Sequence, residues 1–347
     1  MKRVLIGMSG GVDSSVAALL LKEKGYEVIG VTLNLWEKKN DDFAINDAKA
    51  VCDKLGIEHH VLDFRDTFRK NVIDYFAKEY MLGRTPNPCI ACNKYIKFSL
   101  LLETACNMFK CDYIATGHYA KIDFNEKTGR YFLRMSKTDK KDQTYVLYNL
   151  TQEQLSHTLM PLGEYEKEEI REIAEKNNLI NAKRRDSQEI CFVEDNDYVG
   201  FISNQYNYVP KKGNFVDING NKLGEHKGII NYTIGQRKGL GIALGKYQYV
   251  IRFDIEKNEI IIGDEEYLFS DTLFCTDLNF MTIENLSEPM EVTAKIRYAA
   301  KPVKATIIPV EKDKVKVVFE EKQRAITPGQ AVVFYNDGIV VGGGTIL

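Results

Sequence analysis

The sequence lacks any apolar run long enough to span a bilayer, and its first residues lead directly into a short apolar segment rather than a signal peptide. Internal repeats and low-complexity segments are also absent. The formal net charge is only −2, so a nucleic-acid partner would need a local basic surface. Seven cysteines, an odd number, argue against a disulfide framework and favour reactive or metal-binding thiols in a reducing compartment. With 347 residues, we expect two or three domains, a cytoplasmic location and no membrane partner.

One stretch near the start carries the first chemical signal. The apolar run 4–6 is followed by the small-residue loop 9–11 and then by apolar residues at helical spacing up to Gly25. A strand, a glycine loop and a helix in this order direct backbone N–H groups and a helix N-terminus into one crevice, which suits phosphate. The loop has neither the Walker A spacing and lysine nor the Rossmann G-x-G-x-x-G. Its S-G-G-V-D-S resembles the pyrophosphate loop of the ATP pyrophosphatases, which transfer AMP to an oxygen that must leave.

The apolar pattern predicts the fold class. Strands at 27–35, 60–64 and 113–116 alternate with helices at 42–55, 67–82 and 94–109, which is typical of a doubly wound parallel α/β sheet with its ligand at the carboxyl ends of the strands. After residue 195 the chain becomes glycine-rich, with short alternating runs and a hairpin signal at Asn219-Gly220. Evenly spaced strands from residue 273 predict a small β-barrel. We therefore expect an ATP-binding catalytic domain at 1–206, a central β-rich domain at 207–268 and a C-terminal β-barrel at 269–347.

Three cysteines stand out by their surroundings. Cys89 and Cys92 follow the loop T85-P-N-P, and Cys92 lies near the start of the helix 94–109, where the helix dipole would lower its thiol pKa. Cys191 follows a basic and polar segment. There is no second C-x-x-C to complete a structural zinc site, and the pair does not follow a strand as in thioredoxins. We expect small core or structural roles for the other four, Cys52, Cys106, Cys111 and Cys275.

Motifs from the first strand to the last carry a family resemblance. They are S9-G-G-V-D-S, T85-P-N-P, C92-N-K-Y-I-K-F, A115-T-G-H-Y-A, K141-D-Q-T-Y, D186-S-Q-E-I-C-F, T233-I-G-Q-R-K-G-L-G, R297-Y and P328-G-Q. In this order they resemble the bacterial tRNA-specific 2-thiouridylases over nearly the whole chain. The resemblance implies replacement of oxygen by sulfur at carbon 2 of the wobble uridine, position 34 of tRNA. The oxygen is adenylated, sulfur enters from a cysteine persulfide, and AMP and pyrophosphate leave.

The resemblance also implies roles for individual residues. Cys191 would carry the persulfide, and Cys92 would be the second catalytic thiol, ending in a disulfide with Cys191. The ATP site would be lined by Gly7, Met8, Ser9, Gly10, Gly11, Val12, Asp13, Ser14, Leu33 and Gly117. The target base would meet Asn87, Pro88 and Cys89. The rest of the tRNA would contact His118, Lys141, Asp142, Gln143, Arg297, Tyr298 and Gln330, with a tRNA-binding role for the central domain.

The implied partners are Mg²⁺ with ATP, the tRNAs for Gln, Lys and Glu, and a persulfide donor such as a cysteine desulfurase or a relay protein. No Mg²⁺ ligand other than Asp13 is suggested. One departure stands out, because many family members have an aspartate where this chain has Cys89. Cys89, Cys92 and Cys191 could therefore instead hold a [4Fe–4S] cluster, as in related thiolation enzymes. We favour the persulfide route and keep the cluster open, together with another ATP pyrophosphatase, such as an amidotransferase-type or 2-thiocytidine synthetase, or a non-enzymatic sulfur carrier.

Overall fold

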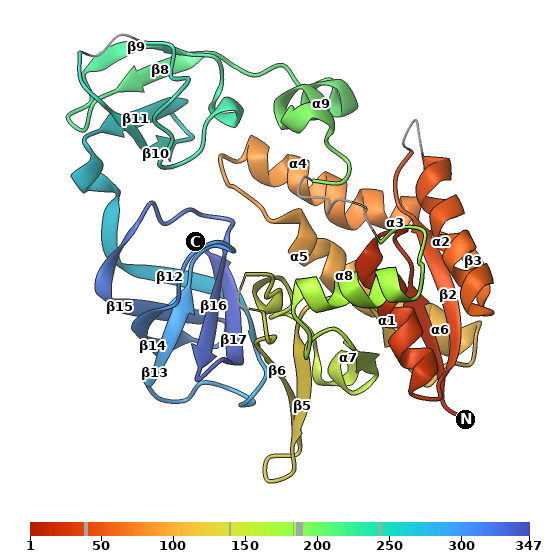
Figure 1. Cartoon of the computed structure of the whole chain (residues 1–347). Coiled ribbons are helices and arrows are strands. Elements are labelled where there is room, and N and C mark those ends of the chain that lie inside the picture. The colour runs from red at the N-terminus through yellow and green to blue at the C-terminus, as the bar shows by residue number, and fades with distance from the viewer. Residues whose placement is uncertain (38–40, 139, 183, 185–189, 243–244) are drawn as a thin grey trace.

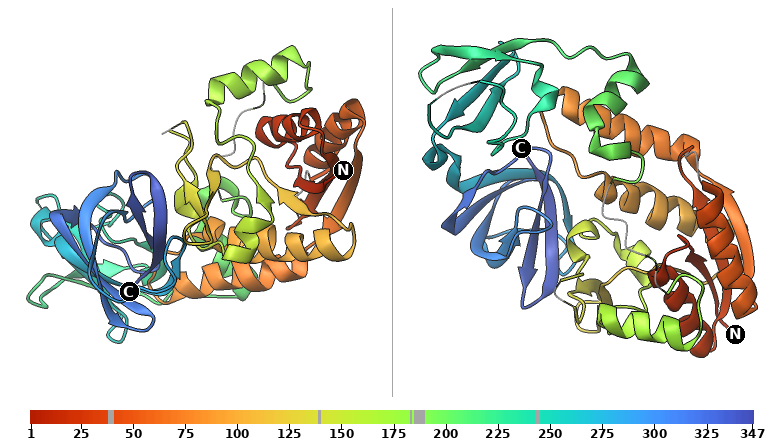
Figure 2. Two further views of the ribbon diagram at one scale, coloured as in Figure 1. Left: turned by 90° about the horizontal axis from the view of Figure 1, so that it is seen from below. Right: turned by 45° about the horizontal axis from the view of Figure 1, so that its top comes forward.

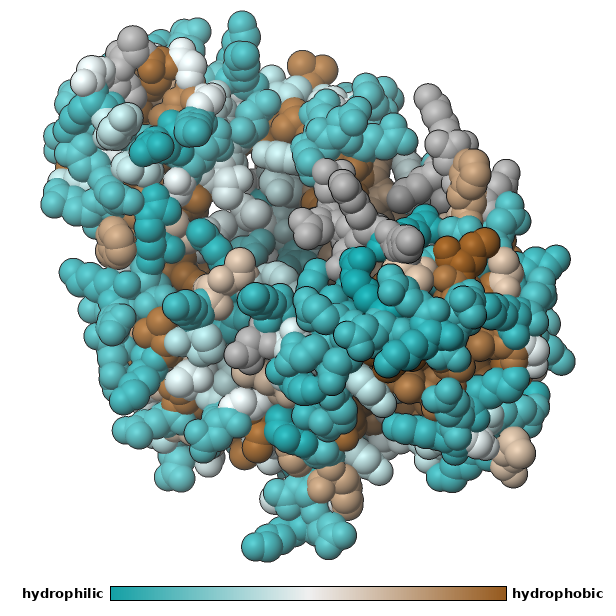
Figure 3. Space-filling view, viewed as in Figure 1, coloured by the Kyte–Doolittle hydropathy of each residue, from teal (hydrophilic) through white to brown (hydrophobic). Residues whose placement is uncertain are grey.

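The computed structural model describes residues 1–37, 41–138, 140–182, 184, 190–242 and 245–347. Figure 1 shows three parts: an α/β domain at right, a small β domain at upper left and a β-barrel at lower left. The face seen in Figure 3 is mostly hydrophilic, with apolar patches at lower right. Within the described residues, no helix combines the length and apolar character needed to cross a membrane.

A five-stranded parallel sheet organises the N-terminal domain, in the order β3-β2-β1-β4-β7. Its strands are β1 (Arg3–Gly7), β2 (Glu27–Asn34), β3 (Glu58–Asp63), β4 (Tyr113–Ala115) and β7 (Thr158–Leu159). Side chains alternate across β1, so that Val4 and Ile6 join the core under α1, α2 and α8, whereas Leu5 joins the core on the opposite face. Helices therefore cover both faces, and the predicted doubly wound sheet is confirmed.

The helices follow the predicted pattern, with two irregularities. They are α1 (Val12–Glu23), α2 (Asp41–Leu55), α3 (Arg65–Phe68), η1 (Arg69–Ile73), α4 (Asp74–Met81), α5 (Pro88–Cys92), η2 (Asn93–Leu100), α6 (Leu101–Asn107), α7 (Gln152–Ser156), α8 (Lys167–Lys176) and α9 (Tyr198–Tyr206). The single helices expected at 67–82 and 94–109 are the continuous runs α3-η1-α4 and α5-η2-α6. Each contains a π-helical segment, η1 or η2, a feature that often marks functional sites.

The middle part is a four-stranded sheet in the order β10-β11-β8-β9. Its strands are β8 (Gly213–Val216), β9 (Lys222–His226), β10 (Tyr249–Asp254) and β11 (Glu259–Gly263). The predicted hairpin is confirmed, because β8 and β9 pair in antiparallel fashion around Asn219-Gly220. Gly220 has a φ of 86°, and the Asp217 carboxylate accepts hydrogen bonds from the backbone N–H of Asn219 and Asn221, both at 2.8 Å. This turn needs a glycine for its positive φ.

The C-terminal part is a closed barrel of six strands, because β12 pairs with both β15 and β17. The strands are β12 (Phe269–Phe280), β13 (Met290–Lys295), β14 (Val303–Glu311), β15 (Lys314–Arg324), β16 (Ala331–Asn336) and β17 (Ile339–Ile346). The sequence did not reveal the hairpin of β5 (Lys121–Asn125) and β6 (Arg130–Arg134), whose strand β6 pairs with β17. In Figures 1 and 2 this hairpin lies between the barrel and the α/β domain.

The barrel is also hydrogen-bonded to the loop before α5. Thr85 donates its N–H to Pro328 O at 2.9 Å, and its carbonyl accepts from Gln330 Nε2 at 2.7 Å. The Tyr145 hydroxyl donates to Ala331 O at 2.8 Å. The two Thr85 hydrogen bonds fix the T85-P-N-P loop against the barrel, although the two are about 240 residues apart in sequence.

Candidate active site

A cavity of about 400 Å³ lies at the carboxyl ends of β1, β2 and β4, where the fold class places a ligand. Of the residues predicted to bind ATP, seven line it: Gly7, Met8, Ser9, Asp13, Ser14, Leu33 and Gly117. Gly10 and Gly11 belong to the loop itself, and Val12 is the buried first residue of α1. Gly10 has a φ of 72°, and a Cβ there would lie 2.6 Å from Ala44 O. A Cβ on Gly117 would lie 2.8 Å from Ser14 N, so β4 leads into a glycine that passes directly against the loop.

Hydrogen bonds hold the loop in place. The Ser14 hydroxyl accepts from Ser9 N at 3.2 Å and donates to Gly11 O at 3.2 Å. The side-chain amide of Asn181 donates to Gly10 O at 3.0 Å and to Gly11 O at 3.1 Å. Asn181 follows α8, and no sequence motif pointed to it. The S-G-G-V-D-S loop is therefore braced by the segment that leads toward Cys191.

A buried ion pair lies at the same loop. Lys167 Nζ donates to Asp13 Oδ1 at 2.7 Å and to Oδ2 at 2.9 Å, and the Tyr119 hydroxyl donates to Oδ1 at 2.7 Å. The Lys167 side chain is 7% exposed and that of Asp13 is 30% exposed. Lys167 begins α8, 154 residues after Asp13, and no sequence motif pointed to the pairing. The Asp13 carboxylate is thus neutralised from within the protein.

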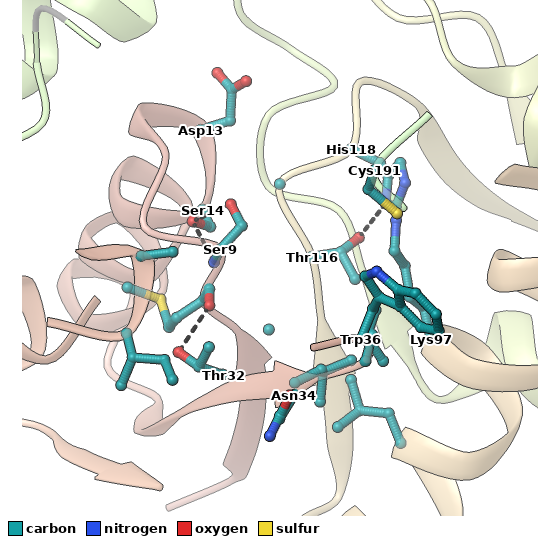
Figure 4. A pocket seen from close by; sticks show the side chains of 18 of the residues that line it. Ser9, Asp13, Ser14, Thr32, Asn34, Trp36, Lys97, Thr116, His118 and Cys191 are labelled. Atoms are coloured by element: carbon teal, nitrogen blue, oxygen red, sulfur yellow. Dashed lines mark hydrogen bonds between the residues drawn. The ribbon is translucent and has the colours of Figure 1, made fainter. Parts of the chain in front are cut away.

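The opposite wall of the cavity carries Cys191. Figure 4 shows Ser9 and Ser14 on one side and Lys97, His118 and Cys191 on the other. The His118 ring shares a hydrogen bond of 2.8 Å between Nδ1 and Thr116 Oγ1. Burial, followed by the charge of Lys97, holds the pKa of His118 well below its ordinary value, so the ring is neutral at physiological pH. The predicted residues His118, Gln143 and Cys191 meet here, and the lining residues Lys97 and Trp36 had no predicted role.

The surroundings of Cys92 differ from those expected for a thiol with a lowered pKa. Cys92 is the last residue of α5 and is only 8% exposed. Burial raises the pKa of its thiol to about 12, and the neighbouring Lys97 only partly offsets this. The predicted lowering by the helix dipole is wrong, because α5 continues into η2 and α6 and leaves Cys92 inside a long helix rather than at its first turn. Cys191 and Cys89 both act electrostatically on Cys92, so the three thiols lie within range of one another's charge.

Comparisons with known proteins cover the whole chain. Family models match residues 2–195 (tRNA methyl transferase HUP domain), 201–264 (tRNA methyl transferase PRC-barrel domain) and 270–346 (aminomethyltransferase beta-barrel domain). The tRNA-specific 2-thiouridylase of Clostridioides difficile (strain 630) is 56% identical, over 99% of this chain and 98% of its own length. That of Acetivibrio thermocellus is 55% identical over 99% of both chains. This chain belongs to the tRNA-specific 2-thiouridylase family. The domain boundaries at 206 and 268 stay a prediction.

The family resemblance also predicted that Asn87, Pro88 and Cys89 contact the target base. Asn87 caps α5, because its Oδ1 accepts from Cys89 N at 3.1 Å, and Pro88 is buried at the first helical position. Asn87 lines a second cavity, of about 710 Å³, between α4, α5 and the barrel. Cys89 is exposed and acts electrostatically on Tyr298 of the barrel. Contact of these residues with a base stays a prediction.

Several residues expected to contact tRNA make contacts within the protein. The buried Asp142 carboxylate accepts from Ser136 N at 3.0 Å and from the Thr144 hydroxyl at 2.5 Å. Burial raises its pKa, and in this conformation it is not accessible to a nucleic acid. Gln143 accepts from Tyr119 N at 2.9 Å.

Two of the barrel residues expected to contact tRNA also make hydrogen bonds within the protein. Gln330 bonds Thr85, as described above, and Arg297 donates to the Thr327 hydroxyl at 3.0 Å. Tyr298 remains 41% exposed. Lys141 is half-buried. Tyr298 is therefore the most accessible of these side chains, and the tRNA contacts as a set stay a prediction.

The remaining cysteines divide between core and surface. Cys52, Cys111 and Cys275 are buried, as expected for structural residues. Cys106, also expected in the core, is exposed, because it lies on the outer side of α6.

Residues 186–189 of the D186-S-Q-E motif lie outside the described residues. In the part of the chain that the structure describes, no group of three or more His, Cys, Asp or Glu side chains could hold a metal ion. The near-full-length relatives do not favour the cluster or another synthetase.

Proposed function

We propose that this protein is an ATP-dependent sulfurtransferase that thiolates carbon 2 of the wobble uridine in the tRNAs for Gln, Lys and Glu. One observation carries the proposal: a single cavity has the S-G-G-V-D-S loop on one wall and Cys191 on the other. A base bound between them could be adenylated from one side and receive sulfur from the other. Membership of the 2-thiouridylase family supports the same reaction.

Adenylation would use the loop at 7–14, together with Leu33 and Gly117. The N–H groups at the start of α1 would hold the β- and γ-phosphates, which leave as pyrophosphate. The uridine O2 attacks the α-phosphorus, and the phosphorus–oxygen bond to pyrophosphate breaks. Mg²⁺ bound with the triphosphate would neutralise part of its charge.

Sulfur transfer would use the two cysteines. A persulfide donor, such as a cysteine desulfurase or a relay protein, loads Cys191 with a second sulfur. The terminal sulfur attacks carbon 2, and the carbon–oxygen bond to AMP breaks. The Cys92 thiolate then attacks the inner sulfur of Cys191, which forms a Cys92–Cys191 disulfide and releases the thiolated base. A thiol reductant, acting in the cytoplasm, restores the two thiols for the next turnover.

The test is an anaerobic reaction with unmodified tRNA for Glu, ATP, Mg²⁺ and a persulfide donor. Mass spectrometry of the digested RNA should detect 2-thiouridine. The variants Cys92→Ser and Cys191→Ser should each abolish the product, whereas Cys52→Ser, whose thiol is buried under α2, should retain it. Cys89→Asp should also retain activity, because this cysteine is exposed and has no part in the two-thiol step. Product formed by Cys92→Ser would contradict the paired-thiol mechanism, and pyrophosphate release without 2-thiouridine would contradict the substrate.

A further inference from the structure

The proposed reaction requires the Cys92 thiol to ionise, although its buried position disfavours the thiolate. Cys92 must attack the inner sulfur of Cys191 as a thiolate, since the neutral thiol is a poor nucleophile. Burial raises the pKa of Cys92 to about 12. The charges that act on Cys92 are those of Cys191, Cys89 and Lys97, and the first two raise its pKa further. Among the described residues, Lys97 is the one whose charge lowers the pKa of Cys92 and so favours the thiolate.

Lys97 is also the one lysine or arginine among the described residues that line the first cavity. The other titratable groups there do not supply a positive charge on the cysteine side. His118 is kept neutral by its burial. Asp13 lies at the opposite wall, where Lys167 and Tyr119 bind it. Within the part of the chain that the structure describes, the positive charge on the cysteine side of the cavity is that of Lys97.

The π-helical segment accounts for this placement. Lys97 follows Cys92 by five residues, and in a regular α-helix such side chains point about 140° apart. In η2 the i→i+5 hydrogen-bonding pattern brings residues five apart to nearly the same side. Lys97 can consequently reach both Cys92 and the cavity wall of His118 and Cys191, as Figure 4 shows for that wall. The lysine three residues earlier, Lys94, lines the second cavity instead.

We propose that Lys97 is a positioning residue whose ammonium group stabilises the Cys92 thiolate during sulfur transfer. This rests on the proposed function for its chemical purpose. The alternative use of Lys97, to bind the α-phosphate of ATP, is disfavoured by its place on the cysteine wall, across the cavity from Ser9 and Ser14.

The experiment measures Cys92 alone, without ATP or tRNA. The full-length protein is treated with iodoacetamide at several pH values, and peptide mass spectrometry gives the alkylation rate at Cys92. Well below its pKa, the rate of a thiol is proportional to its thiolate fraction, so a rise of one pKa unit slows it about tenfold. Lys97→Gln and Lys97→Met should slow alkylation of Cys92 by about tenfold across the pH range. Lys97→Arg, which keeps the charge, should restore most of the rate.

Lys94→Gln is the matched control, since it removes a lysine from the same π-helical segment and should leave the Cys92 rate unchanged. Thermal unfolding of each variant verifies that it is folded. Equal alkylation rates in Lys97→Gln and the unsubstituted protein would overturn the proposal. So would weakened ATP binding with an unchanged rate, which would assign Lys97 to the phosphate. Because the readout needs no turnover, failure of the thiolation reaction itself would be recognised separately, in the unsubstituted enzyme.

Discussion

The Asp13–Lys167 pair allows a quantitative prediction for Lys167→Met. Removing one partner of a buried ion pair costs about 3–5 kcal/mol, because the other charge is left without its counter-ion. Here 30% of the Asp13 side chain is exposed, and Tyr119 continues to donate to it, so water and that hydroxyl solvate part of the orphaned charge. We therefore expect a loss of about 2–3 kcal/mol. For a domain of this size that corresponds to a fall in melting temperature of about 4–12 °C.

Thermal unfolding followed by fluorescence would measure the effect. Lys176→Met is the matched control, since Lys176 lies on the same helix, in an exposed pair with Glu172 at 3.9 Å. Exposed pairs contribute about 0–1 kcal/mol, so its melting temperature should barely move. Asp13→Asn combined with Lys167→Met should recover part of the lost stability, because no unpaired charge remains. The reasoning would be refuted if Lys167→Met shifted the melting temperature no more than the control, or if the two substitutions were simply additive.

Three further predictions concern the site and its support. Gly117→Ala should weaken ATP binding at least tenfold in calorimetry, since its Cβ would lie 2.8 Å from Ser14 N; unchanged affinity would mean that the loop can move aside. In the unsubstituted enzyme, the alkylation rate of Cys92 should rise about tenfold per pH unit between pH 7 and 10, because its pKa of about 12 keeps it protonated there; a plateau near pH 8 would contradict the burial argument. Gln330→Ala should lower the free energy of unfolding by about 1 kcal/mol in urea titrations, since it leaves the Thr85 carbonyl without this donor; no loss would mean that water replaces the bond.

Local patterns were sufficient for the fold class and for the position of the S-G-G-V-D-S loop at the edge of the sheet. The parallel sheet follows from apolar runs that alternate with helical periodicity, and the S-G-G-V-D-S loop follows from the need for glycine beside phosphate. The hairpin at Asn219-Gly220 depends on the positive φ of Gly220 and on the backbone hydrogen bonds that Asp217 accepts from the turn. Such features are encoded by neighbours in the chain, and they can therefore be read without the tertiary structure.

The electrostatics of the site were decided only by the tertiary structure. The pKa of a buried thiol depends on the groups that cover it, so the burial of Cys92 outweighs any helix dipole. The pairing of Lys167 with Asp13 joins residues 154 positions apart, and the burial of Asp142 depends on a turn folded against the barrel. Short strands such as β7 and the β5–β6 hairpin likewise depend on partners distant in sequence. The sequence by itself therefore determined the scaffold and predicted which groups react, whereas the tertiary structure decided the charge, exposure and neighbours of those groups, because these depend on contacts that no local pattern contains.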